Sequence, residues 1–246
     1  MQNVINCFRV LEAVAEHQPV GVSELARLLG MPRTSVFRCL QTLQQAEWLA
    51  PLGHDDTRWR VTARALTIAR ASPERGLREA ALPVLQRLRD ETDETVYLTV
   101  RDGYGAVLVE RLDSNRSVRT FYPLYGRMPL HGPSNAKAIL AHLSEEEIDE
   151  VMTAGLDRYT DTTQCQPDAL RADITATRER GYSINLAEWR PEVCGIGAAI
   201  LDPTMRPVGG TSISMPAFRF DEDDIARYGS LVAAAAAEIA HRLYSV

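Results

Sequence analysis

Residues 33–45 carry hydroxyl, amide and guanidinium groups along one side of an expected helix. Val36, Leu40 and Leu43 recur at i, i+4 and i+7, a spacing that predicts the buried side of that helix. The opposite side carries Thr34, Arg38, Gln41 and Gln45. Such groups hydrogen-bond to base edges and phosphates of duplex DNA. An ordinary helical hairpin whose polar side faces water would show the same pattern, so both interpretations stay open here.

A shorter helix is expected just before this one, over residues 23–29. Ser23 is a typical N-cap residue, Gly30 is typical of a helix end, and Pro32 suits the first turn of the next helix. Two helices joined by a tight break predict a helix-turn-helix in which residues 33–45 form the recognition helix. The buried side of the shorter helix is expected to contain Leu25, Leu28 and Leu29. A first helix, over residues 4–16, is expected to complete the core with Val4, Phe8, Leu11 and Ala15.

Residues 49–61 predict a β-hairpin, since two short apolar strands flank a turn at Gly53-His54-Asp55-Asp56. A hairpin in this place makes a winged helix-turn-helix. Arg58 and Arg60 alternate along one strand and therefore share a face, from which they would contact phosphates or enter a minor groove. The alternative is a hairpin that only packs against the helices, with its arginines in water. Trp59, between the two arginines, is expected in the core.

The predicted DNA-contacting residues come from both parts of this segment. They are Ser23, Arg33, Thr34, Ser35, Arg38, Gln41, Arg58 and Arg60. The whole chain carries a formal net charge of −6, which argues against nonspecific basic binding. Residues 1–72 contain eight arginines and six acidic residues and so carry +2, which leaves −8 on the remainder. A mildly basic head on an acidic body fits DNA held at one end.

Composition and cysteine usage limit the remaining classes. The chain has 246 residues, of which 45% are hydrophobic, and no apolar run approaches the ~18 residues of a membrane span. We expect no signal segment, because the first ten residues belong to an amphipathic helix. Four scattered cysteines without a CxxC pair favour free thiols in the cytoplasm. The histidines and cysteines show no metal-ligand spacing, so we expect no metal and no cofactor.

From residue 77 onward the pattern predicts an α+β fold with an antiparallel sheet. We expect a helix over residues 77–91, a hairpin over 94–114, and a strand over 117–123. Helices over 133–142 and 144–153 follow, the second with a capping box of Ser144 and Glu147, and another helix begins at Gln166-Pro167 and ends at Gly181. Strands after Tyr182, over 193–201 and over 207–215 precede a final helix that Asp221 is expected to cap.

The expected domains are a winged helix-turn-helix over residues 1–62, a linker helix over 63–76 and a sensor domain over 77–246. The linker pattern breaks near Ser72-Pro73. Because a linker helix with a partly apolar face packs well against a symmetry mate, we expect a dimer. Two-fold symmetry also matches paired half-sites on duplex DNA.

Four strings resemble the IclR family of bacterial transcriptional regulators over essentially the full length. They are the winged helix-turn-helix at residues 4–49, PLHGPSNAKAIL, ERGYSINLAEWRPEVCGIGAAILD and GGTSISMP. The resemblance implies an N-terminal DNA-binding domain, a linker helix and a C-terminal effector domain. That effector domain would have a curved antiparallel sheet flanked by helices, of the GAF or profilin type. It also implies a dimer or tetramer that binds operator DNA and a small organic acid.

The same resemblance implies an effector pocket. Its residues would be Pro133, Ser134, Asn135, Asn185, Trp189, Val193, Gly195, Ser212 and Ser214. Ser212 and Ser214 lie two apart on one strand, so their hydroxyls share a face, although a solvated sheet face would look the same. Two positions depart from the family pattern: Asn185 replaces an aspartate, and Gly195 replaces a cysteine, with Cys194 one residue away. With Trp189, the chain resembles a subset of the family concerned with aromatic catabolism. The indole would stack on an aromatic acid, or it would cover the sheet as part of the core.

Two other classes remain as alternatives. Cys194, His131 and Asn185 would supply the nucleophile, base and orienting group of a cysteine-dependent hydrolase. The sequence has no nucleophile elbow, glycine-rich phosphate loop or metal cluster, so we do not expect an enzyme. The other alternative is a winged helix that binds protein, since the head is only slightly basic.

Overall fold

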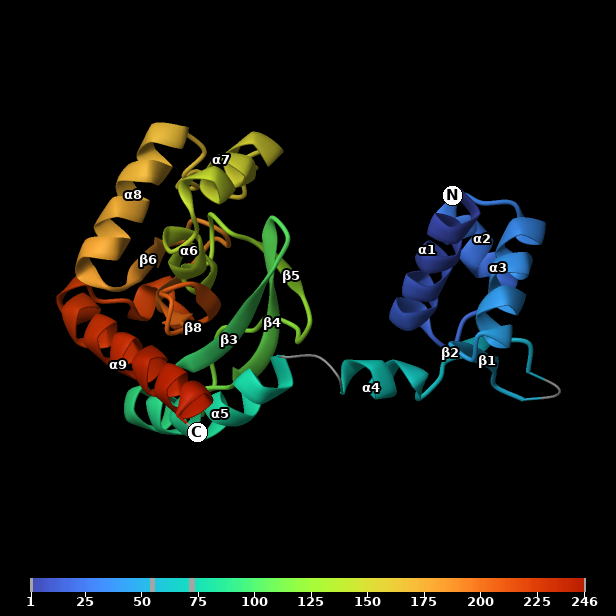
Figure 1. The fold of residues 1–246 in the computed structure, drawn as a ribbon, viewed down its shortest axis with the longest axis horizontal. Coiled ribbons are helices and arrows are strands. Elements are labelled where there is room, and N and C mark those ends of the chain that lie inside the picture. Colours follow the sequence, from blue (N-terminus) through green and yellow to red (C-terminus); the bar gives the residue numbers. More distant parts are fainter. Residues whose placement is uncertain (1, 54–55, 71–73, 246) are drawn as a thin grey trace. The chain divides into compact units, whose positions relative to one another are not determined.

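A computed structural model describes residues 2–53, 56–70 and 74–245 (Figure 1). The chain divides into two compact units, residues 1–72 and 73–246, and each is described by itself. The predicted turn at residues 53–56 and the predicted break at Ser72-Pro73 include residues outside the described ranges. No helix in the described part is both long and apolar enough to cross a membrane.

The first unit is a small helical domain with a two-stranded wing. Its elements are α1 (Gln2–His17), α2 (Val22–Leu29), α3 (Arg33–Gln45), β1 (Leu49–Pro51), β2 (Trp59–Val61) and α4 (Arg64–Ala69). β1 and β2 pair antiparallel, and the Trp59 side chain is buried, as expected. The core also contains Leu25, Leu40 and Leu49, so the three helices and the wing share one apolar interior.

The predicted buried side of α1 is wrong. Val10, Ala13 and Val14 are buried, whereas Val4 and Phe8 are 60% and 56% exposed. Leu11 is half-buried, and Ala15 is exposed. The helix has apolar residues on more than one side, and only its packing against α2 and α3 selects the side that is buried.

Three local expectations in this unit are also corrected. α2 begins at Val22 with Gly21 as its N-cap, so Ser23 lies inside the helix and caps nothing. Leu28 is 40% exposed, whereas Leu25 is the residue of α2 that is fully buried in the core. Arg58 precedes β2, so Arg58 and Arg60 do not alternate within one strand. Gly30 does end α2 in the left-handed conformation, at φ 62°.

The second unit contains a six-stranded antiparallel sheet. Its strands are β3 (Thr95–Asp102), β4 (Gly105–Leu112), β5 (Arg127–Pro129), β6 (Ser183–Leu186), β7 (Val193–Leu201) and β8 (Pro207–Pro216). Their order is β5-β4-β3-β8-β7-β6, and every neighbouring pair is antiparallel. The predicted antiparallel sheet is therefore confirmed, including the hairpins β3–β4 and β7–β8.

Helices cover both faces of the sheet (Figure 1). α5 (Glu74–Thr92) and α9 (Ile225–Tyr244) pack on the face that carries Val96, Leu98 and Ile213. α6 (Ser134–Ala141), α7 (Glu145–Ala154) and α8 (Pro167–Arg180) pack on the face that carries Tyr97 and Leu108. The alternation of side chains along β3 thus divides the interior into two cores.

The helix starts were predicted with mixed success. Ser144 and Glu147 form the expected capping box of α7, with both reciprocal hydrogen bonds present. Asp221 caps a short 3₁₀ helix, Glu222–Asp224, and α9 begins only at Ile225. A second short 3₁₀ helix covers Ala217–Arg219.

The expected strand over residues 117–123 is wrong. This segment has no regular structure, and β5 at residues 127–129 pairs with β4 instead. Thr120 instead fixes the segment over the sheet, because its hydroxyl donates to the Ser214 carbonyl oxygen at 3.2 Å and its carbonyl accepts from the Thr95 hydroxyl at 3.3 Å. The segment therefore lies over β3 and β8 and does not pair along a strand edge.

Two glycines bring the start of α6 onto the sheet. A Cβ at Gly197 would lie 2.5 Å from the Ser134 carbonyl carbon, and one at Gly210 would meet the Asn135 carbonyl. Any side chain at either position would push the first turn of α6 away. Glycine at these positions on β7 and β8 therefore allows α6 to begin directly on the sheet.

Candidate functional site

The outer side of α3 forms the first candidate site. Arg33, Thr34, Arg38 and Gln41 are exposed, whereas Val36, Leu40 and Leu43 are buried beneath them. The helical spacing therefore predicted both sides of this helix correctly. Ser35 is half-buried and lines, with Arg38, a hollow between α1 and α3. Ser23 is exposed near the start of α2.

The two wing arginines differ in their surroundings. Arg58 is bound by Asp56, with its Nε donating at 3.0 Å and an Nη at 2.7 Å. Those bonds lower the pKa of the Asp56 carboxyl to about 2, so Asp56 is ionised at neutral pH and neutralises Arg58. Arg60 is exposed on β2. Arg60 thus offers its charge to a phosphate more freely than Arg58 does.

The second candidate site is a pocket between the sheet and the start of α6. Side chains from distant parts of the second unit line it: Tyr97, Leu108, Thr120, Phe121, Tyr122, Met128, Pro133, Ser134, Asn135, Asn185, Trp189, Arg190, Val193, Ser212 and Ser214. Eight of the nine residues implied by the family resemblance are among them. Gly195 is the exception.

The strand register explains why the serines and one tyrosine share this pocket. Ser212 on β8 lies opposite Tyr97 on β3, and Ser214 lies opposite Gly195 on β7. Ile213, between the two serines, points into the opposite core. The hydroxyls of Ser212 and Ser214 therefore face the pocket and not the solvent.

Gly195 contributes space to this site. A Cβ there would lie 3.0 Å from the Ser134 hydroxyl and 2.8 Å from the Ile213 carbonyl oxygen, so the Ser134 side chain occupies the room that a larger residue would need. Cys194 pairs with Leu186 and Met215 without a bulge and does not line the pocket, as the alternation of side chains predicts.

Two irregular segments meet above the pocket. Arg190 donates to the Phe121 carbonyl oxygen at 3.1 Å, and its guanidinium lies 4.7 Å from the Tyr122 ring and 4.9 Å from the Trp189 ring. The Tyr122 and Trp189 rings pack edge to face at 4.7 Å. Cation–π and aromatic contacts of this kind join residues 119–122 to residues 187–192 and give the pocket an aromatic wall.

The electrostatics of the pocket favour an anion. Arg190 is the one charged residue among the described residues that line it, and no lining residue is acidic. Ser134 and Asn135 form the first turn of α6, whose backbone N–H groups carry partial positive charge. Burial raises the pKa of the Tyr97 hydroxyl, so that group stays neutral. A carboxylate would find hydroxyl donors, helix N–H groups and one cation here.

Sequence reasoning missed Tyr97, Tyr122 and Arg190. Tyr97 had a signal, since it alternates with Val96 and Leu98 and so had to face the opposite side of its strand. Tyr122 lies in the segment expected to form a strand, which has no regular structure. Arg190 follows Trp189 in a segment without a periodic pattern, and only the fold brings it to the pocket.

His131 and Cys194, suggested as the base and the nucleophile of a hydrolase, are both buried. His131 is buried with its Nε2 at 3.0 Å from the Asp157 carbonyl oxygen, and burial lowers its pKa. Burial also raises the pKa of the Cys194 thiol, which disfavours a nucleophilic thiolate. The four cysteines are free thiols. Within the described ranges, no three His, Cys, Asp or Glu side chains come together as a metal site.

Comparison with known families gives the same organisation. The family model for the IclR helix-turn-helix domain matches residues 4–53, and that for the bacterial transcriptional regulator IclR C-terminal domain matches residues 70–241. This chain belongs to the IclR family of bacterial transcriptional regulators. As an IclR-family regulator it is not an enzyme, and the cysteine-dependent hydrolase is set aside.

Several relatives of this IclR-family chain span nearly its whole length. The transcriptional repressor IclR of Escherichia coli K12 is 31% identical over 97% of this chain and 89% of its own length. The repressor AllR of the same strain is 32% identical over 91% and 83%. The crystal structure of an IclR homologue from Microbacterium hydrocarbonoxydans matches with a TM-score of 0.85 at 24% identity, over 99% of this chain and all of the other. That structure supports the fold.

Proposed function

We propose that this IclR-family regulator binds an operator through α3 and the wing, and that a small organic acid in the pocket changes its operator affinity. Thr34, Ser35, Arg38 and Gln41 would contact bases or nearby phosphates, while Ser23, Arg33, Arg58 and Arg60 would hold phosphates. The exposure of the α3 side chains supports these roles. The predicted division into a DNA-binding domain, a linker over residues 63–76 and an effector domain is part of this proposal.

The pocket lining carries the effector half of the proposal. One arginine, no carboxylate, three serine hydroxyls and the start of α6 suit a carboxylate. Tyr122 and Trp189 provide faces against which an aromatic ring would pack. The Microbacterium homologue is described as a complex with 4-hydroxybenzoate, which makes that acid a reasonable first probe. Asn185, in place of the family's aspartate, removes a negative charge that would oppose an acid.

Coupling between acid and DNA requires that the acid bind two arrangements of the protein with different affinities. We propose that the linker transmits this difference within a dimer or tetramer. Leu66 and Ile68 on α4, and Val4, Ile5 and Phe8 on α1, are exposed apolar residues that a second copy would cover. A cytoplasmic location, where bacterial promoter DNA lies, belongs to the same proposal.

The test measures the binding of the full chain to its own upstream region by fluorescence anisotropy, with and without acids. We expect salt-sensitive binding, and a shift in its midpoint with 4-hydroxybenzoate or benzoate. The same acids should raise the melting temperature, since they bind only the native state. Salt-insensitive binding, or none, would contradict the DNA half. A response to short aliphatic keto acids but to no aromatic acid would contradict the aromatic class.

A further inference from the structure

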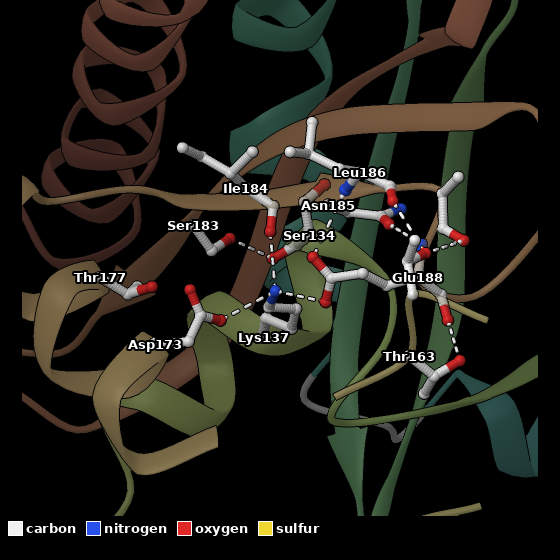
Figure 2. A network of polar contacts seen from close by, with 12 residues as sticks. Ser134, Lys137, Thr163, Asp173, Thr177, Ser183, Ile184, Asn185, Leu186 and Glu188 are labelled. Carbon is white, nitrogen blue, oxygen red and sulfur yellow. Dashed lines mark hydrogen bonds and ion pairs between the residues drawn. The ribbon is translucent and has the colours of Figure 1, made fainter. Parts of the chain in front are cut away.

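The single lysine of the chain lies buried behind the pocket. Lys137 on α6 is 3% exposed, and its Nζ donates to three acceptors (Figure 2). These are Glu188 Oε2 at 2.6 Å, Asp173 Oδ2 at 2.8 Å and the Ile184 carbonyl oxygen at 2.7 Å. An ammonium group has three donors, and all three are used. Lys137 therefore ties α6 to α8, to β6 and to the segment after β6.

The charges of this cluster are nearly balanced. Arg180 lies 3.4 Å from Asp173, so two cations face two carboxylates. Burial raises the pKa of the Glu188 carboxyl, and the ammonium of Lys137 acts against that rise. A buried ion pair contributes little net stability, because desolvation offsets the attraction. What such a pair does supply is a fixed geometry for the groups attached to it.

Glu188 is attached to the wall of the pocket. The next two residues, Trp189 and Arg190, line the pocket, whereas the described lining includes none of Lys137, Asp173 and Glu188. The Glu188 backbone N–H also donates to Asn185 Oδ1 at 2.8 Å, and Asn185 is another lining residue. A fixed Glu188 carboxylate therefore also fixes the directions in which the side chains of Trp189 and Arg190 point.

Threonine hydroxyls hold the same segment from its other side. The threonine bracket, defined here as Thr160, Thr162 and Thr163, donates to the carbonyl oxygens of Leu186, Ala187 and Glu188 at 2.6–3.0 Å. The segment itself has no regular structure, and Ala187 has a positive φ of 56°. A backbone bond from the Ala187 N–H to the Val193 carbonyl oxygen at 3.1 Å joins the two ends of the segment, and the bracket and Lys137 supply side-chain bonds to the part around Glu188.

We infer that Glu188, held by Lys137 and the threonine bracket, is a positioning residue for the effector: it sets Trp189 and Arg190 against the bound acid without touching it. This inference rests on the proposed function for its ligand. It adds that acid affinity depends on an ion pair between Lys137 and Glu188, neither of which is among the described residues that line the pocket.

The first test is a double-mutant cycle in the full-length protein, in which calorimetry measures the Kd for 4-hydroxybenzoate. Glu188→Gln keeps the shape of the side chain but loses the charge, and we expect the Kd to rise about 10-fold. In an Arg190→Ala background the same change should add less than twofold, because the group that it positions is gone. A purely structural role predicts the same factor in both backgrounds, and that result would overturn the inference.

The second test needs no ligand. With 5-fluorotryptophan incorporated, Trp48, Trp59 and Trp189 each give a ¹⁹F signal, and a Trp189→Phe variant assigns the third. Glu188→Gln should shift or broaden the Trp189 signal and leave the other two in place. If no acid binds the unaltered protein, the proposed effector fails while this measurement still decides the positioning. An unchanged Trp189 signal would overturn the inference whichever acid binds.

Two further variants separate positioning from general damage. Glu147 lies on α7, which contributes no described pocket residue, and its carboxylate is 2.5 Å from the Arg101 guanidinium. Glu147→Gln breaks this ion pair and should change neither the Kd nor the Trp189 signal. Thr162→Val removes one exposed hydroxyl of the bracket, so we expect this variant to fold even if Glu188→Gln does not. Thr162→Val should shift the Trp189 signal in the same direction as Glu188→Gln does, and should raise the Kd less than Glu188→Gln does. No effect of Thr162→Val, or an equal effect of Glu147→Gln, would contradict the inference.

Discussion

The outer surface of α3 comes from thirteen consecutive residues, whereas the pocket is assembled from residues between Tyr97 and Ser214. On α3, one helical period separates the groups that face the core from those that face solvent. In the pocket, all six strands of the sheet, the start of α6 and two irregular segments each contribute one or a few side chains. A surface of the first kind depends on one helix staying folded, and a pocket of the second kind depends on the exact placement of several backbones.

The largest effect should follow Leu40→Ala, which removes a fully buried side chain beneath the α3 surface. We expect the first unit to lose about 2–5 kcal/mol of unfolding free energy, and operator binding to fall with it. Urea unfolding and anisotropy measure the two effects. If the units are as separate as their cores indicate, binding of 4-hydroxybenzoate by the second unit should persist.

Phe37→Ala is the matched control on the same helix. Phe37 is 45% exposed, so its truncation should cost no more than about 0.5 kcal/mol of stability. Loss of acid binding in Leu40→Ala would show that the two sites do not depend on separate cores.

The reciprocal change is Gly197→Ala. The new Cβ would lie 2.5 Å from the Ser134 carbonyl carbon, so the first turn of α6 must move. Overpacking of this kind costs about 1–3 kcal/mol, and we expect acid binding to be lost while effector-free operator binding remains. Thermal unfolding and calorimetry test it.

Gly76→Ala serves as its control, because a Cβ there meets only Leu243 Cδ1 at 3.9 Å, an ordinary contact. Acid affinity should be unchanged in that protein. A Gly197→Ala variant with normal acid affinity would show that the position of α6 does not determine the pocket.

The contrast between the sites also explains what the sequence could predict. Local periodicity assigned both sides of α3 correctly, and strand alternation placed Ser212 and Ser214 on one face. The same periodicity failed on α1, because apolar residues on two sides left the choice to tertiary packing. Residues 117–123 have the composition of a strand but no regular structure, because Thr120 bonds to Ser214 on β8 and to Thr95 on β3 and not along the edge of one strand.

Contacts between distant segments carried no sequence signal at all. Lys137 and Glu188 are 51 residues apart in the sequence. Arg190 and Phe121, which are joined by a hydrogen bond, are 69 residues apart. A lone lysine and one more glutamate are not unusual in an acidic chain. The packing of α6 against β6 and β7, and the position of residues 119–122 over the sheet, bring these groups together.

Arg38→Ala tests the α3 surface without disturbing its core. If Arg38 makes a bidentate base contact, operator affinity should fall by about 1–3 kcal/mol and discrimination at one base should weaken. Anisotropy with the operator and with single-base variants measures both. Arg27→Ala, on the exposed side of α2, is the matched control and should retain base discrimination. Equal losses in the two variants would assign Arg38 a nonspecific role.

The smallest effect concerns the wing. Arg60 is exposed, whereas Asp56 already neutralises Arg58, so Arg60→Ala should lose more operator affinity than Arg58→Ala. A lost phosphate contact lowers the slope of log affinity against log salt by about 1, without a change in sequence preference. We therefore expect that change for Arg60→Ala and a smaller one for Arg58→Ala. Because the pKa of Asp56 is about 2, the difference should hold at any pH above about 4. A larger slope change for Arg58→Ala would mean that DNA displaces Asp56 from Arg58.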